Sequence, residues 1–158
     1  MLTQNEEQLV FKVTLRSSVL KSGKVPMYEI LIDDRIVQTG TAVPDTDSMF
    51  VTELIASIPN GNHRLGIRLT NKNSRYDTKV DETGKIVDDL YLMVEKIEID
   101  GIDLGDRILE NSLYTLDQTT EFNGAQINQL SSHNCLTWNG TWTVTFSSPF
   151  YLWLLENL

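Results

Sequence analysis

Cysteine, histidine and long apolar runs are scarce in this sequence, and each shortage removes a class of protein. The single cysteine, Cys135, cannot form a disulfide within the chain, so stability must come from a hydrophobic core. Two histidines and one cysteine do not make a structural zinc site. No apolar run approaches the roughly 20 residues that span a bilayer. The first seven residues, MLTQNEE, lack the basic start and apolar stretch of a signal peptide. We therefore expect synthesis in a cytoplasm and no membrane partner.

Positive charge is also scarce, which argues against nucleic acid as a partner. The chain has 13 Lys and Arg against 22 Asp and Glu, a net charge of −9, and no cluster of basic residues. Such a surface repels phosphate backbones. Catalytic signatures are missing as well: there is no phosphate-binding glycine loop, no dinucleotide fingerprint and no nucleophile elbow. His133 and Cys135 are more simply structural than catalytic, and no carboxylate pair stands out as a glycosidase site. The sequence predicts a protein that is not an enzyme.

Alternation of apolar and polar residues with a period of two dominates the chain, as expected for half-buried strands. The segment 9–15 alternates in this way, and hairpins are predicted at 28–38, 49–70 and 80–87, with turns at Asp33-Asp34, at 59–62 (PNGN) and at Gly84. About eight short strands, without βαβ alternation, predict an all-β fold. We expect one domain over residues 1–158, an antiparallel, jelly-roll-like β-sandwich with at most short helical turns.

Two segments give a weaker pattern. Residues 105–137 fit either a helical turn or an irregular crossing, and residues 150–158 have spacing that suits both a helix and a strand. The run FYLWLL at 150–155 contains six large apolar residues, which cannot all face one core. Exposed apolar patches usually mark interfaces. We therefore predict a partner interface that is formed by Phe150, Tyr151, Trp153 and Leu154. The alternative is burial of this segment inside the monomer.

An acidic and amide-rich segment, residues 71–89, follows the predicted hairpin 49–70 and suggests a cation site. Hard cations such as calcium take six to eight oxygen ligands, which carboxylates and amides supply. The alternative is a solvated acidic loop, because the spacing does not match the helix–loop–helix calcium motif. Calcium is thus the candidate cofactor, and its candidate ligands are Asn71, Asp77, Asp81, Asp88 and Asp89.

Aromatic residues outside the predicted core suggest contacts with sugar rings. Trp142 alternates with Val144 and Phe146 and is expected to point inward. Trp138, just before the Asn139-Gly140 turn, is expected to be partly exposed. Tyr76 and Trp138 are therefore the candidate residues for stacking on a glycan.

Two family resemblances connect these patterns to function. Residues 63–71 (HRLGIRLTN) and 88–101 (DDLYLMVEKIEIDG) resemble calcium-dependent xylan-binding modules, which implies a jelly-roll sandwich with calcium and sugar sites. Residues 28–34, 80–89, 97–102, 139–142 and 149–158 are similar to small proteins of marine T4-like tailed phages that infect cyanobacteria, which implies a virion component.

These resemblances leave two functional hypotheses open. The first is a virion protein, made in the host cytoplasm, that acts through contacts with other virion proteins in many copies, in capsid decoration, a fibre, or the tail and baseplate. The alternative is a carbohydrate-binding module for host-surface glycans that uses calcium.

Overall fold

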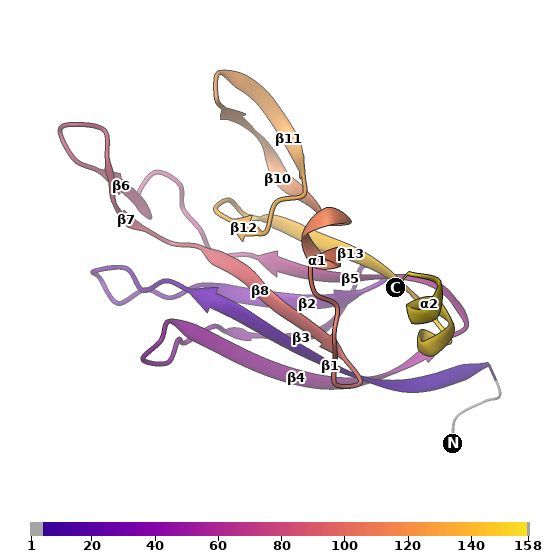
Figure 1. Ribbon diagram of the computed structural model, residues 1–158. Coiled ribbons are helices and arrows are strands. Elements are labelled where there is room, and N and C mark those ends of the chain that lie inside the picture. Colours follow the sequence, from indigo (N-terminus) through magenta and orange to yellow (C-terminus); the bar gives the residue numbers. More distant parts are fainter. Residues whose placement is uncertain (1–4, 158) are drawn as a thin grey trace.

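The computed structural model describes residues 5–157 and shows two antiparallel sheets facing each other (Figure 1). The first sheet contains, in spatial order, β12 (Cys135–Leu136), β8 (Leu92–Ile99), β1 (Glu6–Ser17) and β4 (Met49–Pro59), with β9 (Ile102–Asp103) paired to β8. The second contains β11 (Ala125–Ser131), β10 (Leu113–Phe122), β13 (Gly140–Ser148), β5 (Gly61–Leu69), β2 (Met27–Ile32) and β3 (Arg35–Thr41). The expected all-β sandwich is confirmed, with more strands than the eight expected.

Two short strands and two short helices lie outside the two main sheets. The strands β6 (Thr78–Val80) and β7 (Ile86–Asp89) form a separate two-stranded hairpin, as predicted around Gly84. The helices are α1 (Arg107–Glu110) and α2 (Phe150–Glu156). No helix in the described part of the chain has the length and hydropathy needed to cross a membrane.

The core lies between the inner faces of the two sheets. Leu9, Phe11 and Val13 of β1 are fully buried on one face of their strand, and Trp142 is fully buried on β13, as predicted. Phe11 and Phe146 meet edge to face across the core, with 5.6 Å between ring centroids. Burying each such side chain contributes about 1.5–3 kcal/mol, so the alternating strands themselves account for the sandwich.

The hairpin predicted at 28–38 is confirmed as β2 and β3. Its turn residues Asp33 and Asp34 have φ angles of 51° and 67°, the conformation of a type I′ turn, which matches the twist of paired strands. His63 stabilises this turn through its imidazole ring. Its Nδ1 lies 2.6 Å from Oδ2 of Asp33, and its Nε2 lies 2.6 Å from the carbonyl oxygen of Pro59. His63 therefore has a structural role in this turn.

The prediction of a hairpin at 49–70 is wrong, because the two strands of this segment do not pair with each other. The two strands follow each other through a tight turn, but β4 pairs with β1 in the first sheet, whereas β5 pairs with β13 and β2 in the second. The turn crosses from one sheet to the other, and the backbone N–H of Asn60 donates to the carbonyl of Asn5. Turn residues between two alternating strands do not specify that the strands pair with each other.

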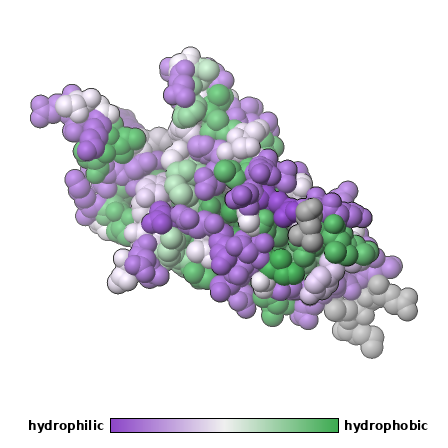
Figure 2. All heavy atoms as spheres, in the orientation of Figure 1, coloured by the Kyte–Doolittle hydropathy of each residue, from purple (hydrophilic) through white to green (hydrophobic). Residues whose placement is uncertain are grey.

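The segments left open from sequence are now defined. Residues 150–156 form the helix α2, and the uncertain region 105–137 contains α1, the long hairpin β10–β11 and the short strand β12. This hairpin turns at Asn123-Gly124, both with positive φ (52° and 82°). In Figure 1 the hairpins β6–β7 and β10–β11 project as two arms from one end of the sandwich, while α2 lies toward the other end. Figure 2 shows the arms as separate projections of the surface.

Candidate functional site

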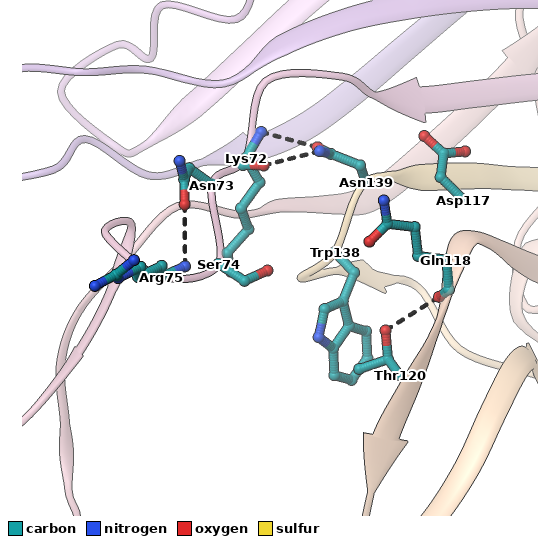
Figure 3. A pocket seen from close by; sticks show the side chains of 9 residues that line it. All are labelled: Lys72, Asn73, Ser74, Arg75, Asp117, Gln118, Thr120, Trp138 and Asn139. Atoms are coloured by element: carbon teal, nitrogen blue, oxygen red, sulfur yellow. Dashed lines mark hydrogen bonds between the residues drawn. The ribbon is translucent and has the colours of Figure 1, made fainter.

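A polar hollow of about 420 Å³ lies at the arm-bearing end of the sandwich (Figure 3). One side is formed by the segment 72–75, which follows β5, and the other by β10 where it leaves the main sheet. Trp138 and Asn139 come from the turn between β12 and β13. The residues that line the hollow are Lys72, Asn73, Ser74, Arg75, Asp117, Gln118, Thr120, Trp138 and Asn139.

The hollow exists because β10 separates from β13 halfway along its length. The two strands pair from Leu113 to Leu116, and β10 then continues only with β11, where the register shifts between Thr115 and Thr120. Gly140 permits the close approach just before this separation. A β-carbon at Gly140 would lie 2.5 Å from the carbonyl oxygen of Thr115. The register shift interrupts the pairing of β10 between Thr115 and Thr120. In this stretch Asp117, Gln118 and Thr120 line the hollow.

Trp138 is held in place by two aromatic neighbours. The hydroxyl of buried Tyr114 donates to the carbonyl of Trp138 and accepts its backbone N–H at 3.0 Å. Burial raises the pKa of Tyr114, so this hydroxyl stays protonated and able to donate. Phe122 packs edge to face against the indole, with 5.7 Å between ring centroids. The half-buried indole is therefore positioned before any ligand arrives.

Asn139 joins the two sides of the hollow. Its side-chain oxygen accepts the backbone N–H of Lys72 at 2.8 Å, and its side-chain nitrogen donates to the carbonyl of Lys72 at 2.8 Å. This pair of bonds, drawn in Figure 3, reproduces the pairing of a neighbouring strand. The segment that begins at Lys72 is thereby fixed to the turn that carries Trp138.

A second, mainly apolar hollow of about 350 Å³ shares Lys72 and Trp138 with the first. His133 and Cys135 line it, and the imidazole of His133 stacks on Tyr114. Burial, reinforced by the charge of Asp89, raises the pKa of the Cys135 thiol, so the neutral thiol is favoured. A neutral thiol is a poor nucleophile, in agreement with a structural interpretation of the cysteine. Within residues 5–157, Nε2 of His133 is buried and has no hydrogen-bond partner.

The carboxylates around the hollows are already paired with cations. Lys72 Nζ lies 2.6 Å from Asp89 Oδ1, and Arg68 donates to Asp117 at 2.9 Å. Lys24 Nζ lies 2.5 Å from Asp77. Burial opposes ionisation of Asp77, but the hydrogen bonds from Lys24 and from the backbone of Asn73 outweigh it and hold the pKa below its usual value.

The five predicted calcium ligands are not brought together. The side chain of Asn71 bonds the backbone at Val25 and Met27, and Asp81 accepts three hydrogen bonds inside its own β6–β7 turn. Asp88 accepts the backbone N–H of Lys21. Asp77 and Asp89 hold ammonium groups, as described above. Among residues 5–157, no three His, Cys, Asp or Glu side chains converge as a metal site. In this arrangement the residues do not fit calcium.

The two predicted stacking residues lie differently. Trp138 lines both hollows, as its predicted function requires. Tyr76 is 60% exposed and follows the lining residue Arg75, but it does not line the hollow, and the guanidinium of Arg75 covers its ring at 5.4 Å. Sequence reasoning missed Asn73, which lies outside any strand, and Gln118 and Thr120, which lie in β10 where its register against β11 shifts. The dipeptide Asn123-Gly124 was the available signal that a hairpin borders this region.

The predicted partner interface is corrected in part by the structure. Phe150 is fully buried and packs in the core, so its ring cannot face a partner, and Trp153 and Leu154 are half-buried against that core. Tyr151 is exposed, together with two residues that the prediction did not include, Leu152 and Leu155. One turn of a helix directs these side chains to opposite sides, which explains the division.

Comparison with known proteins supports the fold. No protein-family model matches the sequence, and a search of curated proteins found no match. The selenomethionine form of vCBM60, one of the calcium-dependent carbohydrate-binding modules linked by circular permutation, matches with a TM-score of 0.51 and 16% identity, over 86% of this chain and 89% of that chain. The complex of vCBM60 with galactobiose matches with a TM-score of 0.47 and 15% identity, over 87% and 97%. At this identity the likeness shows a shared β-sandwich. The resemblance to phage proteins gains no support from these comparisons.

Proposed function

We propose that the protein binds carbohydrate in the polar hollow beside Trp138, and that it does so without catalysis. The observation that carries the proposal is the anchored indole, faced across the hollow by amide and hydroxyl groups. A sugar ring has an apolar face, which suits an aromatic ring, and a rim of hydroxyls, which suits amide donors and acceptors. The volume of about 420 Å³ falls within the usual range of small-molecule sites, roughly 300–1,000 Å³.

The shared fold adds support. The sandwich resembles that of vCBM60, a carbohydrate-binding module. Function depends on the site rather than on the fold, so the residues of the hollow must be tested directly.

Affinity electrophoresis in gels that contain soluble xylan, galactan or β-glucan tests the proposal, followed by calorimetric titration with galactobiose and xylo-oligosaccharides. Retardation by at least one polysaccharide is expected. Trp138→Ala should weaken binding about 10- to 100-fold, because it removes a central aromatic anchor. Tyr151→Ala, an exposed aromatic on α2, is the matched control and should bind like the wild type. Equal binding by wild type and Trp138→Ala, or no retardation by any polysaccharide, would contradict the proposal.

The exposed side of α2 supports a second candidate, attachment to a larger assembly such as a phage particle. Tyr151, Leu152 and Leu155 expose apolar surface there, and such surfaces commonly mark contacts between proteins. The strand β13 runs from Gly140 at the hollow to Ser148 before α2, roughly 30 Å. Glycan binding and attachment would therefore use separate ends of the molecule. Mass spectrometry of purified phage particles tests this role, and absence of the chain from the particles would remove it.

A further inference from the structure

We propose that the buried ammonium of Lys72, rather than a calcium ion, supplies the positive charge that holds the hollow in shape. The structurally similar module is described as calcium-dependent, whereas among residues 5–157 of this chain no three His, Cys, Asp or Glu side chains converge as a metal site. Calcium requires several oxygens that all face one point. Here the buried Asp77 and the largely buried Asp89, whose side chain is 16% exposed, face ammonium groups instead.

The position of Lys72 explains why a cation is useful there. Its side chain is 2% exposed, and its Nζ lies 2.6 Å from Asp89 Oδ1, on β7. The same carboxylate oxygen accepts the hydroxyl of Thr78, on β6, at 2.6 Å. The backbone of Lys72 is bonded to Asn139 in the turn that carries Trp138. One residue thus connects the β6–β7 arm, the segment 72–75 and the turn before β13.

Electrostatics reinforces this assignment. The charge of Lys72 also reaches Asp77 and is one of the influences that lower the pKa of that carboxyl. A calcium ion that bound Asp89, whose side chain is 16% exposed, would have to displace the ammonium of Lys72. Because that ammonium is covalently attached, it would then stay buried without a partner. A tethered cation needs no supply of metal and is insensitive to chelation.

For glycan binding, this inference rests on the proposed function. If the hollow binds sugar, its affinity should be the same in the presence of calcium and of a chelator. Lys72 acts as a positioning residue in this scheme, since it aligns the segment 72–75 with Trp138 through its own backbone and its ion pair.

Thermal unfolding of the wild-type protein in EDTA and in calcium chloride is the first test, with calorimetric titration of calcium alone. We expect the same Tm in both solutions and no binding heat. A rise in Tm of several degrees with calcium, or a saturable calcium titration, would overturn the proposal. This result does not depend on any glycan, so it remains decisive even if no polysaccharide binds and the proposed function fails.

Substitution of the lysine is the second test. Lys72→Met keeps the apolar stem but leaves Asp89 without its cation, and we expect Tm to fall by roughly 5–15 °C. The matched control is Lys79→Met on the exposed part of β6, which should shift Tm by less than about 2 °C. The double variant Lys72→Met with Asp89→Asn should recover part of the loss, because it removes the uncompensated charge.

Recovery in the double variant separates an electrostatic role from packing alone, since lost packing would not be restored by neutralising Asp89. If the Tm of Lys72→Met equals that of Lys79→Met, Lys72 does not act as the cation of this site. The same conclusion follows if the Tm of the double variant is lower than that of Lys72→Met. If Lys72→Met does not fold, the comparison of wild type in chelator and in calcium still decides the question.

Discussion

The strongest test of the site concerns the hydroxyl of Tyr114. This hydroxyl bonds both the N–H and the carbonyl of Trp138, and Tyr114 itself is fully buried. Tyr114→Phe keeps the ring in the core but leaves the two backbone groups unpaired. Each unsatisfied group costs about 1–3 kcal/mol, and water can reach this half-buried turn, so we expect a total loss near 2–3 kcal/mol in the free energy of unfolding. For a domain of this size that lowers Tm by about 4–12 °C.

The assay is urea unfolding followed by tryptophan fluorescence, together with glycan affinity. Tyr76→Phe is the control, because it removes the hydroxyl of a ring that is 60% exposed and should change the free energy of unfolding by no more than about 0.5 kcal/mol. Tyr114→Phe should also weaken glycan binding, since Trp138 loses its anchor. If Tyr114→Phe unfolds at the same urea concentration as the control, the hydroxyl does not hold the turn and the argument for a preformed site is wrong.

Three further predictions concern other parts of the molecule. Gly140→Ala should destabilise the protein by about 1–3 kcal/mol in urea unfolding, because the new methyl group meets the backbone at Thr115; a neutral result would contradict the close approach of β10 and β13. Stability should fall as pH drops below about 4, through the lowered pKa of Asp77, and Asp77→Asn should reduce this acid dependence of Tm; an unchanged dependence would assign the loss to other carboxylates. Trp153→Ala should cost about 2–4 kcal/mol in urea unfolding, whereas Tyr151→Ala should cost almost nothing; equal losses would mean that the helix packs differently.

The fold was predictable to the extent that burial alone decides it. The alternation of β1 survives in the structure because every second side chain enters the core. The separation of β4 and β5 into different sheets was not predictable, since a tight turn between alternating strands fits a hairpin and a crossing between sheets equally well. The strands of the β10–β11 hairpin are largely exposed and lack a clear apolar face. The hairpin was therefore missed, although the dipeptide Asn123-Gly124 is a typical hairpin turn.

The site was less predictable, for a different reason. Trp138 was singled out from the sequence because an aromatic residue beside a turn is expected to be partly exposed, and its contact with a glycan stays a prediction. The acidic residues around it suggested calcium because sequence shows carboxylates but not their partners. Lys72 and Asp89 are 17 positions apart and meet only after the β6–β7 hairpin forms. Sequence order therefore concealed the ammonium that pairs with Asp89.

Likeness of fold to a calcium-dependent module does not by itself transfer calcium to this chain. At 16% identity, what the two chains share is a pair of sheets with a buried core, and binding residues often lie on loops, where sequence varies more than in the strands. A lysine whose stem is buried and whose ammonium meets a carboxylate can supply the positive charge that a loop of carboxylates needs. Replacing a diffusible ion by a tethered one leaves the scaffold intact and alters only how the loop is held. The response of Tm to calcium and to chelator therefore shows whether an ammonium or a metal ion holds the hollow of this chain in shape.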